Sequence, residues 1–155
     1  MSYLKDTVVI GTVGAGYAAH LHASGYEKVN KVKVRLKTVC DLNQNLAQEL
    51  KEQYGYENIT ANYNDLLNDP EIDVVDIITP PFTHCDLAIK ALRAGKHVIV
   101  EKPLTGYFGK KGEQNVGLTT KRSVMYEEVL RSMDELKDEV ERSGKKFMYA
   151  ENHVY

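Results

Sequence analysis

The triplet Glu101-Lys102-Pro103 directly follows the apolar run from His97 to Val100. A lysine in this place can hydrogen-bond a substrate hydroxyl and take part in proton transfer. In extended chain the side chains of Glu101 and Lys102 point to opposite sides, so the carboxylate need not neutralise the ammonium. One side chain can then face a reaction site while the other anchors the backbone. Without Pro103 and the glycine motif upstream, a surface salt bridge would be the better interpretation of Lys102.

The glycine motif lies near the start of the chain and fits G-x-G-x-x-G/A, with Ala19 at the third position. Gly14 permits a tight turn from strand to helix, and Gly16 leaves room for a pyrophosphate against the backbone. The free N–H groups at the start of the following helix would face the phosphates. A tight turn that binds no ligand is the alternative. The residues that we expect to bind a dinucleotide here are Gly14, Ala15, Gly16, Tyr17 and Ala18.

Asp41 follows the end of the second predicted strand. A carboxylate there can accept hydrogen bonds from both hydroxyls of an adenosine ribose, as in dinucleotide-binding domains, and helix capping is the alternative. It would repel a 2′-phosphate, and Leu42 beside it supplies no compensating cation. The sequence therefore favours NAD over NADP as the cofactor. A P-loop is excluded because no Gly-Lys-Ser/Thr follows the glycines.

Thr79-Pro80-Pro81 follows another buried strand, and the prolines turn the chain across the strand ends. Thr79 can hydrogen-bond a ribose or a phosphate, whereas a simple strand terminator is an equal alternative. His84, near the next helix start, could stack on the cofactor or hydrogen-bond it. A structural role is the favoured interpretation of His84.

Strand-like and helix-like segments alternate along the chain. We expect strands at 7–13, 32–40, 74–79, 97–100 and 147–150, and helices at 16–24, 45–54, 63–68, 85–94 and from 123 or 125 to 143. Strands joined by helices imply right-handed parallel crossovers, so the predicted fold is α/β with a doubly wound parallel sheet. The segment 105–122 carries four glycines and little apolar periodicity, so an irregular functional or mobile loop is expected there.

The bulk composition is that of one ordinary domain spanning residues 1–155. The net charge of −2 does not indicate binding to nucleic acid or to an anionic membrane. Cys40 and Cys85 have no disulfide or metal spacing and are expected to be small core residues, which suits a reducing cytoplasm. His20 and His22 do not share a helix face, so we expect no metal site between them.

Taken together, the Gly-Ala-Gly turn, Asp41, Thr79-Pro80-Pro81 with His84, Ala94-Gly95-Lys96-His97-Val98 and Glu101-Lys102-Pro103 closely resemble the glucose–fructose oxidoreductase / inositol dehydrogenase (Gfo/Idh/MocA) family. The resemblance covers nearly the whole chain. It implies a Rossmann domain that binds NAD(P), with Lys102 assisting hydride transfer at a carbon of a small sugar or polyol substrate. Thr79, Pro80 and Glu101 are then expected to position the nicotinamide half, and Asn152 looks like the family's asparagine near that ring.

Two departures from the family qualify this interpretation. The family usually continues into a β-sheet domain that carries most substrate contacts, and none of it is expected within these 155 residues. The segment 105–122 replaces a shorter link and could form a lid or an interface. We therefore expect a chain that binds NAD but turns over poorly. A non-catalytic dinucleotide sensor or interaction module and an NAD-assisted glycoside hydrolase are the alternatives, and the assembly state, a homo-oligomer included, is left open.

Overall fold

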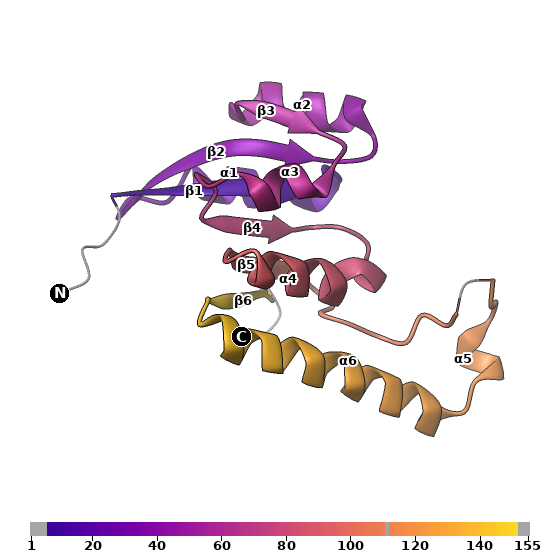
Figure 1. The fold of residues 1–155 in the computed structure, drawn as a ribbon. Helices are drawn as coiled ribbons and strands as arrows, with labels where there is room; N and C mark the ends of the chain where they lie inside the picture. The colour runs from indigo at the N-terminus through magenta and orange to yellow at the C-terminus, as the bar shows by residue number, and fades with distance from the viewer. Residues whose placement is uncertain (1–5, 111, 152–155) are drawn as a thin grey trace.

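The computed structural model describes residues 6–110 and 112–151, which form a six-stranded sheet flanked by helices (Figure 1). The strands are β1 (Thr7–Val13), β2 (Lys33–Cys40), β3 (Asn58–Thr60), β4 (Val74–Ile77), β5 (His97–Glu101) and β6 (Phe147–Ala150). The helices are α1 (Tyr17–Tyr26), α2 (Gln44–Tyr54), α3 (Tyr63–Asn68), the 3₁₀ turn η1 (Pro81–Thr83), α4 (His84–Arg93), α5 (Val116–Thr119) and α6 (Arg122–Ser143).

The sheet is parallel throughout and has the strand order β3-β2-β1-β4-β5-β6. The chain winds outward from β1 to β3 and then returns to pair β4 with the other side of β1. This reversal creates a crevice beyond the carboxyl ends of β1 and β4, where doubly wound sheets bind their ligands. The predicted fold class is confirmed.

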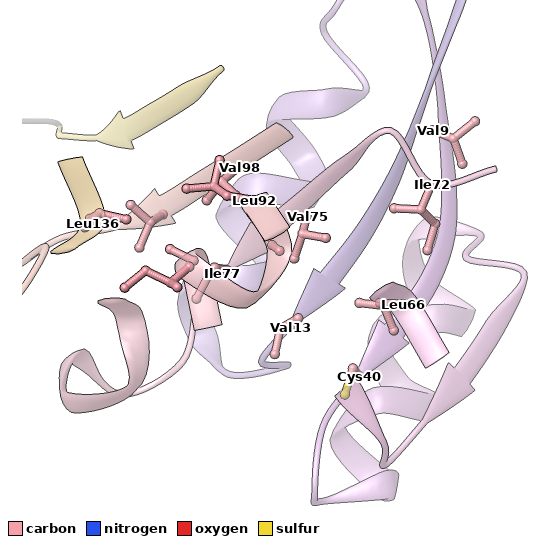
Figure 2. Close-up of a cluster of buried hydrophobic side chains, with 14 residues drawn as sticks. Val9, Val13, Cys40, Leu66, Ile72, Val75, Ile77, Leu92, Val98 and Leu136 are labelled. Carbon is pink, nitrogen blue, oxygen red and sulfur yellow. The ribbon is translucent and has the colours of Figure 1, made fainter. Parts of the chain in front are cut away.

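Two apolar layers hold the helices on opposite faces of the sheet. One layer packs small residues of α1 against α2, with Ala19, Ala23, Ala47 and Leu50 buried. The small alanines let α1 approach the strands closely, which brings its N-terminus to the crevice. The other layer, drawn in Figure 2, joins the strands to α3, α4 and α6 through side chains such as Leu66, Val75, Ile77, Leu92, Val98 and Leu136.

The helix α6 is tied to its neighbour by charge as well as by apolar contact. Glu139 is buried on α6 and accepts a hydrogen bond at 2.8 Å from the Arg93 guanidinium at the end of α4. Arg142 on the next turn donates to the same carboxylate. A carboxylate packed between two helices needs such partners, because a charge taken out of water without a partner is destabilising.

Apart from shifts of one or two residues at the ends of other elements, three features differ from the expectations drawn from the sequence. The helix α1 does not end at residue 24 as expected but runs on to Tyr26. The three-residue strand β3 was not predicted, because a segment so short is defined by its pairing with β2 rather than by its own pattern. The segment 105–122 is not wholly irregular, since it contains the short helix α5 and the first residue of α6.

Most of this segment extends past the arrowheads of the central strands, on the side of the sheet where the crevice lies (Figure 1). At its start the Thr105 hydroxyl lies 3.4 Å from the Ser132 hydroxyl on α6. Phe108 then packs edge-on against Phe82 of η1, with ring centroids 6.2 Å apart. The segment is therefore attached both to α6 and to the turn that follows β4.

Across residues 6–110 and 112–151, we find no helix that combines the length and the apolar character needed to cross a membrane.

Candidate functional site

The glycine turn after β1 is fixed by contacts that only glycine permits. Gly14 has a φ of +98°, and a Cβ added there would lie 2.4 Å from the carbonyl oxygen of Ile78. Its N–H donates to the Cys40 carbonyl at 2.8 Å, which holds the turn against the end of β2. Gly14 is therefore needed for the close approach of β1 to the β4 side of the sheet.

Gly16 has a different role from Gly14. It is the N-cap of α1 with an ordinary φ of −77°. A Cβ built there meets no described atom within 4 Å, so the protein itself does not require glycine at this position. The first N–H groups of a helix have no partner within it. Open space beside such N–H groups fits a pyrophosphate pressed against the backbone.

Asp41 connects β2 to the glycine turn. Its Oδ2 accepts the Ala15 N–H at 2.7 Å, and its Oδ1 accepts the Asn43 N–H at 2.7 Å. The N-cap of α2 is instead Asn43, whose side chain accepts the Asn45 N–H at 3.1 Å. The helix-capping alternative for Asp41 is therefore wrong, and its carboxylate stands at the mouth of the crevice.

The crevice has a volume of about 800 Å³, within the usual range of ligand pockets. Seven of the predicted residues line it: Gly14, Gly16, Tyr17, Ala18, Asp41, Thr79 and Pro80. The remaining walls are mostly apolar and were not predicted from the sequence. They include Leu42, which is 90% exposed, together with Leu46, Ala61, Tyr63, Phe82 and Leu87.

Cys40 forms part of the crevice lining at the end of β2. Burial, with the nearby carboxylates of Asp41 and Asp65, raises the pKa of its thiol to about 11. The thiol therefore stays neutral near pH 7 and adds no negative charge beside a bound phosphate. Among the residues that the structure describes, no group of three His, Cys, Asp or Glu side chains could hold a metal ion.

His84 does not contact the crevice, although it was a candidate for cofactor binding. The residue is fully buried, and its two ring nitrogens lie 2.9 Å from the Pro103 carbonyl oxygen and 2.7 Å from that of Thr79. Both nitrogens are thus engaged with backbone groups. The structure supports the structural alternative, in which His84 links the chain after β4 to the chain after β5.

The Glu101-Lys102-Pro103 corner also lies outside the crevice wall, as does Pro81, which lines a neighbouring cavity beside the 105–110 segment. Glu101 is half-buried, and its Oε2 accepts the backbone N–H of Lys102 at 2.6 Å. Lys102 itself is exposed, and the peptide bond to Pro103 is cis. Glu101 anchors the backbone, as one of the two expected roles. Lys102 is exposed and does not line the crevice, so the expectation that it faces the reaction site stays a prediction. Asn152, the remaining candidate, lies outside the described residues.

One cluster of polar and charged side chains close to the site was not predicted from the sequence. His22 on α1 contacts both Asp76 on β4 and Glu101 at the end of β5. The signal was present, because a charged Asp76 inside an otherwise apolar strand requires a partner. His22 and Tyr26, four residues apart on one helix face, are the groups that meet it.

Comparison with known proteins assigns the domain. The family model GFO_IDH_MocA, described as "Oxidoreductase family, NAD-binding Rossmann fold", matches residues 8–128. The chain belongs to this family. The chain therefore carries an NAD-binding Rossmann domain, and its crevice lies at the point where the strand order reverses, which is where such sheets bind their ligands.

Relatives of this chain include dehydrogenases. A levoglucosan dehydrogenase of Pseudarthrobacter phenanthrenivorans is 37% identical over 102 residues, which cover 61% of this chain and 26% of that protein. A myo-inositol 2-dehydrogenase of Thermotoga maritima is 31% identical over 96 residues, covering 62% of this chain and 28% of that protein. The chain thus spans about a quarter of the length of the curated relatives that it matches.

A solved structure of levoglucosan dehydrogenase in complex with NADH superimposes with a TM-score of 0.68. It is 26% identical in sequence, and the match covers 93% of this chain and 34% of that one. Nearly all of the present chain therefore has a counterpart in a structure that holds NADH.

Proposed function

We propose that this domain binds NAD in the crevice and is the cofactor half of an oxidoreductase acting on a secondary alcohol of a sugar or polyol. The observation that carries the proposal is the glycine turn tied to Asp41 at the mouth of an apolar crevice. The names of the relatives support the substrate class. Cys40 and Cys85 are both free thiols, and free thiols are typical of proteins in the reducing environment of the cytoplasm.

The adenosine and pyrophosphate half follows from the geometry of the turn. Within the run from Gly14 to Ala18, the first two N–H groups are donated to Cys40 and Asp41, so the N–H groups from Gly16 to Ala18 and the positive end of the α1 dipole face the phosphates. A carboxylate has about four acceptor sites, and Asp41 uses two of them for the N–H groups of Ala15 and Asn43. Two sites remain for the 2′- and 3′-hydroxyls of a ribose. A 2′-phosphate would meet the same negative charge and be repelled.

The nicotinamide half would extend past Thr79 and Pro80 toward the Lys102 corner. Bound NAD supplies a hydride acceptor for the alcohol carbon. The Lys102 amine would hydrogen-bond the alcohol oxygen, whose proton would be released to water as the hydride leaves its carbon for NAD. Glu101 holds the backbone of Lys102, and Asn152 is proposed to lie near the ring. The Thr79 hydroxyl donates to Thr83, so it meets a ligand as an acceptor.

Isothermal titration of the purified chain with NAD and with NADP tests the binding step. We expect NAD to bind at least about tenfold more tightly, a difference of about 1.4 kcal/mol. Asp41→Asn should weaken NAD binding and narrow the difference between the two cofactors, because the repelling charge is gone. Glu49→Gln, the same loss of charge on the exposed side of α2, should change neither affinity. Equal affinities of the unmodified chain for NAD and NADP would refute the role of Asp41.

Net formation of NADH separates the proposed reaction from its alternatives. A dehydrogenase accumulates NADH as alcohol is consumed, whereas a glycoside hydrolase that oxidises its sugar only transiently returns the hydride in each turnover. A sensor module binds NAD without either result. Absorbance of NADH during incubation with a panel of sugars and polyols identifies a dehydrogenase, and release of free sugar from glycosides in parallel samples separates a hydrolase from a sensor.

A further inference from the structure

The imidazole of His22 lies between two carboxylates that come from different strands. Its Nδ1 lies 3.1 and 3.0 Å from the two carboxylate oxygens of Asp76. Its Nε2 lies 3.6 Å from Oε1 of Glu101. The side chains of His22 and Glu101 are only 15% and 18% exposed, and Asp76 is fully buried. One ring thus connects α1, β4 and the end of β5.

The buried Asp76 requires a donor from His22. A carboxylate accepts hydrogen bonds only, and burying it without donors would cost several kcal/mol, on the order of 3–5. The Tyr26 hydroxyl donates to Oδ2 at 2.7 Å. Burial and the negative charge of Asp76 raise the pKa of Tyr26, so that this hydroxyl remains a donor. The second donor is the Nδ1–H of His22, which fixes a proton on that nitrogen.

Nε2 of His22 faces the carboxylate of Glu101, which, like that of Asp76, can only accept hydrogen bonds. Burial alone would lower the pKa of His22. The hydrogen bond to Asp76 and the charges of Asp76 and Glu101 act in the opposite direction, and together they raise the pKa above its ordinary value. With both nitrogens protonated, the ring attracts both carboxylates. Without the second proton, a lone pair of Nε2 would face Oε1 of Glu101 and repel it.

We propose that His22 is a positioning residue for the Lys102 corner: its ring, when both nitrogens carry a proton, holds the carboxylate of Glu101, which in turn holds the backbone of Lys102. The second step is the 2.6 Å hydrogen bond from the Lys102 N–H to Oε2 of Glu101. Because His22 belongs to the helix whose N-terminus opens onto the crevice, the same ring links the phosphate-binding end of the site to its proposed proton-transfer end. Any effect of His22 on hydride transfer rests on the proposed function. The contacts from His22 through Glu101 to the backbone of Lys102 do not depend on it.

A titration near neutral pH in this cluster belongs to His22. The other titratable groups around it are the hydroxyls of Tyr26 and Tyr56 beside Asp76, and Tyr149 with Glu151 beside Glu101. Tyrosine hydroxyls titrate well above neutral pH and carboxylates well below it. His84 is the other histidine at this corner, because its ring contacts the Pro103 carbonyl. A change at Lys102 is therefore attributable to His22 when its inflection coincides with that of the His22 ring nitrogens and not with that of His84.

Nuclear magnetic resonance of the ¹⁵N-labelled chain tests the link without cofactor or substrate. We expect the Lys102 amide resonance to shift with pH and to show its inflection where the ring nitrogens of His22 titrate. Glu101→Gln should lower the pKa of His22 and abolish the inflection at Lys102. The proposal fails if the Lys102 amide does not change while His22 titrates, or if Glu101→Gln leaves the His22 titration unmoved.

His20→Gln provides the matched control on the same helix. The His20 ring packs against Tyr54, with centroids 5.6 Å apart, on a different face from His22. Its replacement should leave both the His22 titration and the Lys102 inflection unchanged. Loss of the inflection in this variant would assign the effect to a general loosening of α1 and overturn the specific role of His22. Titration of the same samples with NAD reports separately on the proposed function.

Discussion

The glycine turn and the Lys102 corner both lie at the carboxyl edge of the sheet, yet they are held in place by different means. The turn is fixed by backbone groups: Gly14 lies against the Ile78 carbonyl and donates its N–H to Cys40. The corner is fixed by side chains, with Glu101 facing His22 and the Pro103 carbonyl facing His84. The cofactor-binding end is thus built into the path of the chain, whereas the corner depends on the charge and identity of a few side chains.

This difference predicts that substitutions at the turn change folding or cofactor binding, and that substitution of Lys102 changes the chemistry with little effect on stability. The predictions that follow test this contrast, beginning with the largest effect.

Gly14→Ala should destabilise the protein strongly. The new Cβ would lie 2.4 Å from the Ile78 carbonyl, and the residue would keep a φ that side chains disfavour. Strain of this kind costs on the order of 3 kcal/mol. Chemical denaturation followed by circular dichroism measures the loss. A variant as stable as the unmodified chain would show that the turn is less fixed by sterics than we infer.

Gly16→Ala should give the opposite pattern to Gly14→Ala. The structure has room for the methyl group and the φ is ordinary, so stability should change by less than about 1 kcal/mol. NAD affinity should nevertheless fall by at least about tenfold, because the methyl group occupies space needed for the pyrophosphate. Calorimetric titration beside a denaturation curve separates the two effects. Unchanged NAD affinity would mean that the pyrophosphate does not pass over this residue.

Stability should depend on pH through His22. Its pKa is raised in the folded state, so its contribution is fully present below the unfolded value of 6.5 and is lost as pH rises through the folded value. The free energy of unfolding, measured in urea from mildly acidic to mildly alkaline pH, should therefore fall across that window. His22→Gln should remove this part of the pH dependence. An equally steep fall in the variant would assign the dependence to another group.

Lys102→Met should have the smallest effect of the series on folding and binding. The side chain is exposed and does not line the crevice, so both the unfolding free energy and the NAD affinity should stay within error. Any NADH formed from a sugar or polyol should be lost. A large drop in NAD affinity would place the lysine on the cofactor rather than on the substrate oxygen.

The features that could be read from the sequence are those that depend on neighbouring residues. The turn around Gly14, the position of Asp41 and the anchoring of the backbone by Glu101 all follow from local geometry. The cluster of His22, Asp76 and Glu101 could not be placed, because it forms only when a helix and two strands come together. The residues that form the crevice walls were not predicted for another reason. Leu42 and Tyr63 belong to no motif, and they line the crevice only because α2 and α3 begin beside it.

The interpretation of His84 shows how burial decides between two plausible roles. Its place after the prolines suggested a contact with the cofactor as well as a structural role. Its complete burial and its two carbonyl partners favour the second. The sequence pattern does not show whether the first residue of a helix, such as His84 in α4, points toward the sheet or toward solvent.

The strand order also has a kinetic consequence. The central strand β1 is completed only when β4 pairs with it, and this pairing joins residues such as Val9 and Asp73, 64 positions apart. Closing so long a loop is a late and slow event compared with forming local helices. Since the crevice has walls from both sides of this pairing, a partly folded chain would have no place for the nucleotide. Fluorescence of added NADH during refolding would therefore report the moment at which the two halves of the sheet join.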